Sequence, residues 1–165
     1  MFRPFLILCA VLTAASASMQ AQATVRIEAT NLQGSRPLQE QTSRAAIRDY
    51  LQSWQALTAA FDENRVDLLD PEFVGSAKDT LAATIQQQTA LGISTRYQDR
   101  SHDLQLVFYS PEGLSIQLID TVEYDVQILD DDKVQTTQHV RARYVAVLTP
   151  TEVRWKVRIF QAEPK

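Results

Sequence analysis

The sequence LSIQLIDTVEYDVQIL, residues 114–129, alternates between apolar and polar side chains over nearly its whole length. Because side chains in a β-strand point alternately to opposite faces, this stretch predicts a long strand with one buried and one solvated face. The apolar face is the even-numbered one, from Leu114 to Ile128, and its one charged member is Asp120. A carboxylate is costly to bury unless it is paired, so Asp120 calls for an explanation.

Three further segments keep the same period of two and predict three more strands. They cover about 97–109, 136–148 and 153–159, and turn sequences rich in Asp, Pro, Ser and Thr separate them. The inward-facing series is His102, Leu104, Leu106 and Phe108 in the first segment, and Val153, Trp155, Val157 and Ile159 in the last. Strands that follow one another through short turns form an antiparallel sheet.

Before residue 97, the apolar residues recur with the period of a helix. Apolar residues recur at intervals of three and four over Ser43–Phe61, which predicts an amphipathic helix. A second helix is expected over Ser76–Leu91, and Asp70–Glu72, with its proline, predicts the start of a further helix. Helices followed by an antiparallel meander indicate an α+β fold, in which N-terminal helices pack on one face of a curved antiparallel sheet of four or more strands.

The first 23 residues predict a signal peptide, and residues 43–161 a single domain. Arg3 precedes a short apolar run, and small residues beyond it allow cleavage after Ala17 or Ala23. The run is shorter than the roughly 20 residues that span a bilayer. We therefore expect a periplasmic or secreted chain with no stable membrane span after cleavage, and a retained anchor is the alternative. Residues 24–42 are a leader or linker, in which 24–29 form a short edge strand or an irregular segment.

The composition excludes several kinds of site and partner. The 165-residue chain has 20 acidic and 16 basic residues, a net charge of −4, which argues against nucleic acid as a partner. Its one cysteine, Cys9, lies in the predicted signal peptide, so the remaining chain has no thiolate ligand and no disulfide. Since the chain has only two histidines, His102 and His139, we expect no metal site and no cofactor.

The turn at 130–133 sets the pairing between the central strand and the next one. One register that keeps the apolar faces together includes three pairs that bear on function: Asp120 with Tyr144, Tyr124 with Val140, and Glu123 with Arg141. A shift of two residues would keep the same faces and change these partners. Asp120 then has a phenol beside it, and a carboxylate removed from water is suited to general acid–base chemistry. The candidate catalytic residues are Asp120, Tyr144, Tyr124 and His102. In the structural alternative, Asp120 bonds the Tyr144 hydroxyl or a helix terminus, or lies in water at the rim.

The opposite face of the last two strands is basic. Its five basic residues are Arg141, Arg143, Arg154, Lys156 and Arg158. They form either a solvated face balanced by nearby acids, or a surface that docks an acidic partner, an anionic polymer or a second copy of the chain. Ile119, Val145 and Val147 make this face less polar than solvation alone requires, which favours a protein interface.

The order of these elements resembles the NTF2-like superfamily, also called cystatin-like or SnoaL-like, in a secreted bacterial form. The residues that carry the resemblance are RAAIRDYLQSWQALTAAF (44–61), the segment Asp70–Phe73, and HVRARYVAVLTPTEVRWKVRIFQ (139–161). The resemblance implies a cone, in which a curved antiparallel sheet wraps around the first helix. It also implies either an isomerase or cyclase that uses a pocket Asp with Tyr or His partners, or a non-catalytic module for binding, dimerisation or secretion.

Two functions follow from these observations. We favour an exported, non-enzymatic binding or protein-interaction module. Its cone holds a small apolar ligand or serves as core, and its sheet face contacts a second copy or an envelope protein. The alternative is a small-molecule isomerase, cyclase or hydrolase-like enzyme, with Asp120 as acid or base and Tyr144, Tyr124 or His102 as hydrogen-bond donors. Fold class alone does not choose between them.

Overall fold

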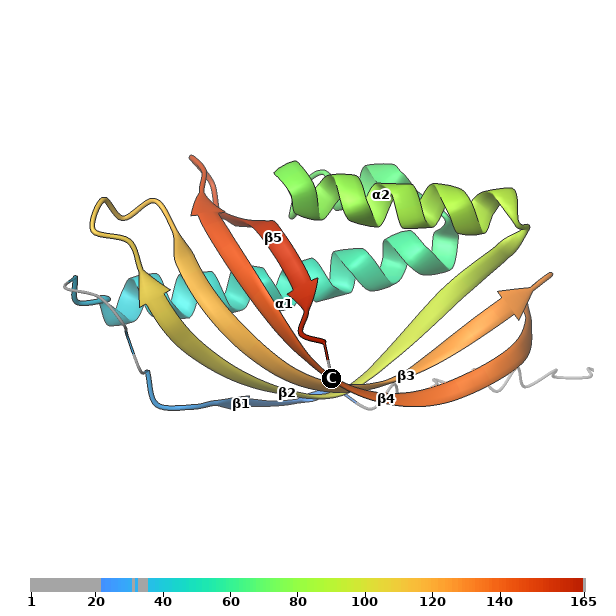
Figure 1. The fold of residues 1–165 in the computed structure, drawn as a ribbon, viewed down its shortest axis with the longest axis horizontal. Helices are drawn as coiled ribbons and strands as arrows, with labels where there is room; N and C mark the ends of the chain where they lie inside the picture. Colours follow the sequence, from blue (N-terminus) through green and yellow to red (C-terminus); the bar gives the residue numbers. More distant parts are fainter. Residues whose placement is uncertain (1–21, 31, 33–35, 165) are drawn as a thin grey trace, which may run out of the picture.

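The computed structural model describes residues 22–30, 32 and 36–164. Residues 1–21 of the predicted signal peptide therefore lie outside the described residues. A curved sheet wraps around the long helix α1, and α2 lies on the same concave side (Figure 1). The elements are β1 (Thr24–Ile27), α1 (Glu40–Glu63), the 3₁₀ helix η1 (Val66–Leu69), α2 (Gly75–Ala90), β2 (Ile93–Tyr109), β3 (Ile116–Asp130), β4 (Lys133–Pro150) and β5 (Trp155–Ala162). The predicted α+β class is confirmed.

The five strands lie in the order β1-β2-β3-β4-β5, and β2 to β5 are antiparallel, as predicted. β1 pairs with β2 in parallel, so part of the segment at 24–29 is a strand and the sheet is mixed. Two parallel strands need a long crossover connection, and α1, η1 and α2 supply it. All three predicted pairs between β3 and β4 are present, including Asp120 opposite Tyr144.

Helix α1 is longer than predicted at both ends. It takes in Glu40–Thr42, three residues predicted to belong to the linker. At its other end Asn64 adopts a left-handed conformation (φ 54°), and the N–H of Asn64 donates to the carbonyl of Ala60. Its buried residues form one stripe that runs from Ala46 to Phe61. Through this stripe, α1 packs against the concave face of the sheet.

The segment Asp70–Glu72 does not begin a helix, contrary to the prediction. It forms a turn after η1, and α2 begins further along the chain. The backbone around Phe73 pairs instead with β5. The Val74 N–H donates to the Val157 carbonyl (3.0 Å), and the Val157 N–H donates to the Glu72 carbonyl (2.9 Å). The local helix signal fails because the edge of β5 takes the backbone groups that a helix would have used.

Register shifts between paired strands break the predicted alternation of side chains, and two of them turn outward a residue that was predicted to face inward. In β2 the register shifts between Leu106 and Phe108, so Phe108 pairs with Gln117 and faces outward. In the pairing of β4 with β5, a second shift places Ile159 opposite Val147, again on the outer face. The predicted inward positions of Phe108 and Ile159 are therefore wrong. An extra residue in a strand reverses the side chains that follow it.

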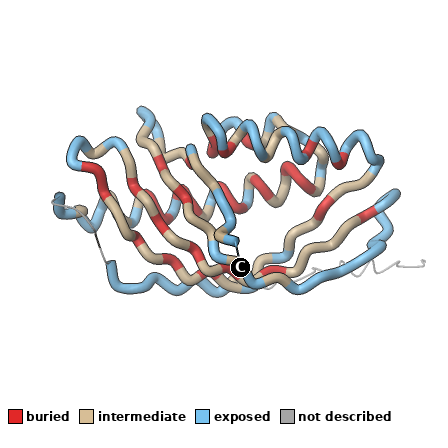
Figure 2. The backbone as a smooth tube through the Cα atoms, viewed as in Figure 1, coloured by how far each residue is buried: buried red, intermediate tan, exposed pale blue. Residues whose placement is uncertain are grey.

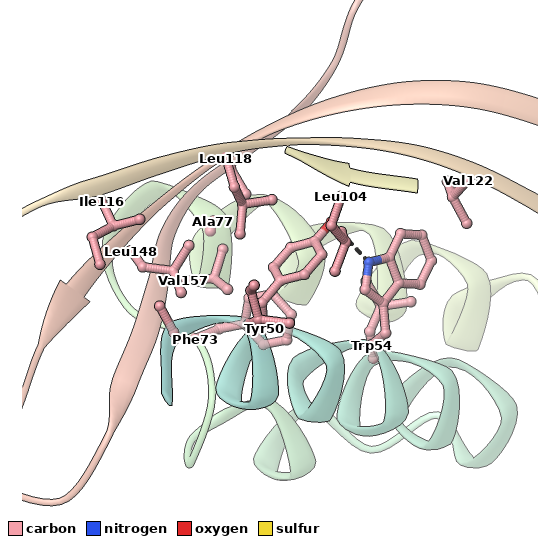
Figure 3. Packing of buried hydrophobic residues seen from close by; sticks show 14 of the residues in the cluster. Tyr50, Trp54, Phe73, Ala77, Leu104, Ile116, Leu118, Val122, Leu148 and Val157 are labelled. Carbon is pink, nitrogen blue, oxygen red and sulfur yellow. Dashed lines mark hydrogen bonds between the residues drawn. The ribbon is translucent and has the colours of Figure 1, made fainter. Parts of the chain in front are cut away.

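The core lies between α1 and the concave face of the sheet. Figure 2 shows buried residues alternating with less buried ones along the strands and recurring along α1. Tyr50, Phe73, Leu104 and Leu118 are among the largest fully buried side chains, and Figure 3 shows them gathered between the helix and the strands. Asp120 is 0% exposed in the same layer. The apolar face therefore encloses a fully buried carboxyl group.

Replacing Phe73 by Ala is expected to lower the free energy of unfolding by about 3–5 kcal/mol, because its side chain is 1% exposed and fills the core. Urea unfolding followed by circular dichroism measures the change. Val153→Ala is the matched control, since Val153 is 81% exposed and its truncation should cost less than about 0.5 kcal/mol. Equal losses for the two variants would contradict this assignment of the core.

Candidate functional site

A chain of hydrogen bonds crosses the core from α1 to the sheet. The indole N–H of Trp54 donates to the Tyr50 hydroxyl (2.9 Å), and that hydroxyl donates to Oδ2 of Asp120 (2.9 Å). From β2, Nδ1 of His102 lies 2.8 Å from the same Oδ2. All four residues are at most 2% exposed. Side chains from α1 and β2 therefore meet on one carboxylate oxygen of β3.

His102 lies between two carboxylates. Its Nε2 is 3.6 Å from Oδ2 of Asp99, on the side of the ring away from Asp120. Burial of the imidazole lowers its pKa, but Asp120 and Asp99 raise it by more, so that the pKa of His102 stands at about 9. The ring is therefore positively charged at neutral pH, and it forms a buried ion pair with Asp120.

Aromatic rings fill the space around this pair. Trp54 has four ring neighbours with centroids 5.2–6.0 Å from its own: His102, Tyr124, Tyr144 and Phe160. Tyr144 does not bond Asp120, although the two are paired in the sheet. Its hydroxyl lies 3.2 Å from the hydroxyl of Tyr124. Burial and this hydrogen bond raise the pKa of Tyr144, so its phenol stays protonated.

Most hydrogen-bonding positions in the network are already occupied. The Tyr50 hydroxyl accepts from Trp54 and donates to Asp120, and burial followed by the Asp120 charge raises the pKa of Tyr50 well above its usual range. The two nitrogens of His102 face carboxylates. Two buried oxygens, Oδ1 of Asp120 and Oδ1 of Asp99, have no hydrogen-bond partner among the described residues. These oxygens are where the network can still accept a proton or a water.

The structure brings the four predicted site residues into two contacts. His102 and Asp120 bond each other, and Tyr124 and Tyr144 bond each other. In the structural alternative, Asp120 was expected to bond the Tyr144 hydroxyl or a helix terminus, or to lie in water at the rim. It instead bonds side chains of α1 and β2. The predicted residues thus lie in one cluster, but with different pairings.

Tyr50, Trp54 and Asp99 belong to the cluster and were not predicted as site residues. The helical period does place Tyr50 and Trp54 on the buried side of α1, but the partner of Tyr50 lies 70 residues away in the sequence. Strict alternation from His102 would turn Asp99 outward. The bulge between Asp99 and Ser101 turns it inward, opposite Tyr124.

The five basic residues predicted on one face separate into two groups. Arg141 and Arg143 lie on the outer face of β4, and both are exposed. Arg141 pairs with Glu123 (3.5 Å), and Arg143 pairs with Glu163. This first group therefore stands beside acids on a surface that solvent reaches.

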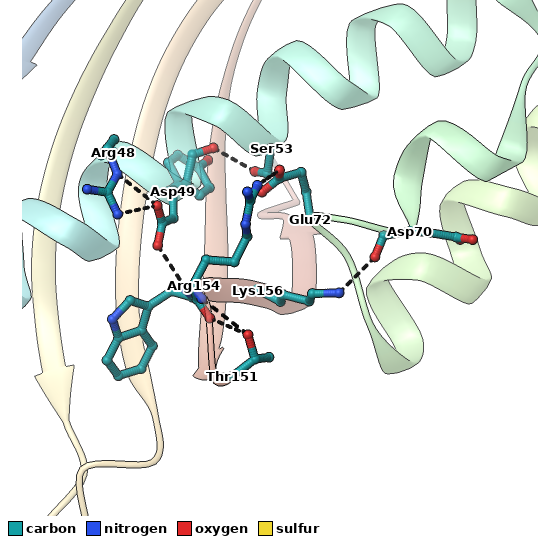
Figure 4. A network of polar contacts seen from close by, with 10 residues as sticks. Arg48, Asp49, Ser53, Asp70, Glu72, Thr151, Arg154 and Lys156 are labelled. Atoms are coloured by element: carbon teal, nitrogen blue, oxygen red, sulfur yellow. Dashed lines mark hydrogen bonds and ion pairs between the residues drawn. The ribbon is translucent and has the colours of Figure 1, made fainter.

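The second group contacts the connection between η1 and α2. Arg154 pairs with the buried Glu72, and Nζ of Lys156 donates to the Asp70 carbonyl (2.9 Å; Figure 4). Arg158 lies against the first residue of α2. Arg154 and Lys156 therefore join the start of β5 to the loop that follows η1, and Arg158 contacts α2.

Within residues 22–30, 32 and 36–164, no group of three or more His, Cys, Asp or Glu side chains is placed to hold a metal ion. In the same part of the chain, no helix combines the length and apolar character needed to cross a membrane.

The ion pair predicts a stability that falls with pH. The folded state holds the His102 proton more tightly than the unfolded state, so this stabilisation is complete below about pH 6.5 and is lost as the pH rises through about 9. A pKa that moves from 6.5 to about 9 corresponds to about 3 kcal/mol. Urea unfolding of the chain from Thr24 at several pH values across this window measures the decline.

Asp120→Asn supplies the test of this cause. It keeps the side-chain shape but removes the carboxylate, so the pKa of His102 should fall and the decline should largely disappear. Asp125→Asn is the matched control, because Asp125 makes a similar contact with His139 (3.0 Å) on the solvent-exposed face. It should retain the decline of the unmodified protein. An undiminished decline in Asp120→Asn would exclude the buried pair as its source.

Comparison with known proteins identifies the fold. No protein-family model and no curated protein matches the sequence. The intermembrane-space region of the chloroplast protein ARC6 matches with a TM-score of 0.62 and 13% identity, over 79% of this chain and 100% of that chain. A protein of the NTF2-like family from Streptomyces avermitilis, assigned as a dehydratase, has a TM-score of 0.52 and 10% identity over 74% and 97% of the two chains. A periplasmic fragment of TraM has a TM-score of 0.51 and 12% identity over 73% and 98%. Identities this low establish the fold alone, and the chain has the NTF2-like fold.

Proposed function

We propose that this protein is an exported interaction module that forms a dimer through the outer face of its sheet. One observation carries the proposal: an apolar strip on that face, formed by Phe108, Ile119, Val145, Val147 and Ile159. These five residues are called the outer strip below. Helices α1 and α2 cover the other, concave face (Figure 1).

The outer strip crosses four strands, and Gln117 of β3 lies between two of its members. Phe108 of β2 and Val147 of β4 both pair with Gln117, and Ile159 pairs with Val147 in turn. Ile119 and Val145 form the neighbouring pair. All five apolar side chains are partly exposed. Single exposed apolar residues are ordinary on a protein surface, whereas a joined patch indicates an interaction site.

The charges beside the outer strip favour a second copy as the partner. Glu123 pairs with Arg141, and Arg143 pairs with Glu163, so both signs lie on the same face. A surface that carries both signs can be complementary to itself across a two-fold axis. A purely acidic partner would leave Glu123 and Glu163 facing like charges.

The interior of the cone supports a structural role for the buried cluster. Asp120 is 0% exposed, and the His102 nitrogens both face carboxylates, so neither is open to a substrate. Aromatic rings around Trp54 occupy the place where a small ligand would bind. We therefore assign the cluster to the core and the interaction to the outer face.

Export rests on the signal peptide predicted at residues 1–23. On this basis we place the mature chain in the periplasm or outside the cell. Two proteins with the same fold, the TraM fragment and the ARC6 region, are described from a periplasm and an intermembrane space. Those locations are compatible with a fold that functions outside the cytoplasm.

A small-molecule enzyme of the dehydratase or isomerase kind is the second candidate. The observation that favours it is the buried Oδ1 of Asp120, which has no partner among the described residues and lies near the Tyr124 and Tyr144 pair. A thermal-shift screen of small hydroxylated carbonyl compounds tests it. A compound that stabilises the unmodified protein but not Asp120→Asn would favour the enzyme over the interaction module.

The dimer is expected to depend on the outer strip. Size-exclusion chromatography with light scattering on the chain from Thr24 should give twice the monomer mass. Val145→Glu places a charge at the centre of the outer strip and should give a folded monomer, because an unpaired charge in an interface costs several kcal/mol. Arg143→Glu should weaken the dimer less, since Arg143 lies at its border.

Val134→Glu is the control for these variants. Val134 is an apolar residue at the start of β4 that is 46% exposed, away from the outer strip, and its variant should remain dimeric. Circular dichroism verifies that each variant is folded. A monomeric unmodified protein, or a Val145→Glu variant that still forms the dimer, would rule out the proposed interface.

A further inference from the structure

A groove of about 510 Å³ lies between β1 and the first half of α1. It is lined by Ile27, Arg44, Ile47, Arg48, Leu51, Gln52 and Gln55. None of these residues belongs to the buried cluster or to the outer strip. Its volume falls within the range of sites that bind ligands.

The groove exists because α1 does not cover the whole inner face of the sheet. Val25 and Ile27 are aligned with His102 and Leu104 of β2, both of which are buried on the inner face. Aligned residues of paired strands share a face, so Val25 and Ile27 also face inward. They are nevertheless 42% and 59% exposed. The apolar inner face thus continues past the helix as an uncovered margin.

The backbone of β1 has hydrogen-bonding groups to offer at this margin. β1 is the first strand of the sheet, and β2 is its one neighbour among the described strands (Figure 1). The Glu28 N–H donates to the Leu104 carbonyl of β2 (2.8 Å). Because successive N–H groups of a strand point in opposite directions, the Ile27 N–H faces the other edge. An open edge beside an apolar groove is the arrangement to which an extended peptide adds as a strand.

Two arginines give the groove a positive rim. Arg44 and Arg48 are one helical turn apart on α1, and their side chains are 76% and 68% exposed. Each has an acidic neighbour, Glu40 for Arg44 and Asp49 for Arg48. The Arg44–Glu40 pair is exposed on both sides and contributes at most about 1 kcal/mol, so Arg44 can also bind an incoming carboxylate. Arg48 contacts the buried Asp49 through Nε and one Nη, and its other Nη remains to donate to the same carboxylate.

We propose that this groove binds an extended peptide segment of a partner protein. The segment adds to β1 as a further strand, and its alternate apolar side chains contact Ile27, Ile47 and Leu51. A carboxylate of the segment, from an acidic side chain or its C-terminus, binds Arg44 and Arg48. A four-residue strand such as β1 spans about 13 Å, which suits a short linear segment better than a folded domain. The proposal is independent of the dimer.

The test is selection of a phage-displayed library of random decapeptides on the chain from Thr24, immobilised through its C-terminus. We expect enriched peptides to alternate apolar and polar residues and to carry at least one acidic residue. Synthetic versions are then measured by fluorescence anisotropy. Amidation of the C-terminus, or replacement of the acidic residue by its amide, identifies the source of the carboxylate.

Three variants probe the three parts of the site. Leu51→Glu places a charge in the apolar floor, and the double variant Arg44→Glu with Arg48→Glu reverses the rim. Ile27→Pro removes the N–H that faces the open edge without removing one bonded to β2, and proline is tolerated in edge strands. Each should weaken peptide binding by about tenfold or more. Val134→Glu, which lies away from the groove, should leave binding within about twofold.

Three outcomes would overturn the proposal. The first is the absence of any enriched alternating acidic pattern. The second is binding that Ile27→Pro and the double arginine variant leave unchanged. The third is an Ile27→Pro variant that loses the dimer while no peptide is enriched, which would assign the open edge to a second copy of the chain. Light scattering of Ile27→Pro and Val145→Glu side by side separates this result from failure of the outer strip.

Discussion

The negative charge of Asp120 is balanced at Oδ2 by protein groups that come from elements far apart in the chain. His102 of β2 supplies the opposite charge, and Tyr50 of α1 supplies a hydrogen bond. Removing an ion from water costs several kcal/mol, and the loss is offset only when the partner groups are correctly placed. A displaced α1 would leave the buried carboxylate without the Tyr50 hydrogen bond, whereas apolar side chains pack in many ways. We interpret the Tyr50–Asp120 hydrogen bond as a contact that selects one position of α1 on the sheet, more than as a source of net stability.

A second set of polar contacts fixes the position of β5. The buried carboxylate of Asp49 accepts the Trp155 N–H (2.9 Å), which joins the start of β5 to α1 (Figure 4). Arg154 and Lys156 join the same end of β5 to the loop after η1. β5 is one of the shortest strands and has β4 as its one neighbour within the described sheet. Its position therefore depends on side-chain contacts in addition to the backbone hydrogen bonds of the sheet.

Periodicity predicted most of the fold, and it failed where one residue broke the period. Alternation and the position of a turn led to the observed pairing of Asp120 with Tyr144, since a buried face excludes shifts by one residue and the turn favours one of the remaining registers. The same alternation misplaced Phe108 and Ile159, because bulges are not visible in the apolar pattern. The site was predicted in part. The alternation of side chains placed His102 and Asp120 on one face of the sheet. The contact of Asp120 with Tyr50 spans 70 residues, and no local sequence signal encodes such a pairing.

The two edges of the sheet are finished differently. Backbone groups beside Phe73 bond Val157 on the outer side of β5, and β1 carries exposed side chains and no strand beyond it among the described residues. A further stretch of edge lies in β4, because β5 pairs only with Tyr144–Pro150 and leaves Lys133–Arg143 with β3 as its one neighbour among the described strands. Most side chains of that stretch are exposed, and Lys133, Arg141 and Arg143 carry charge. Charged side chains on an open edge oppose pairing with another chain. The long edge of β4 is thus protected against unintended strand addition by charge, whereas β1 limits it by being only four residues long.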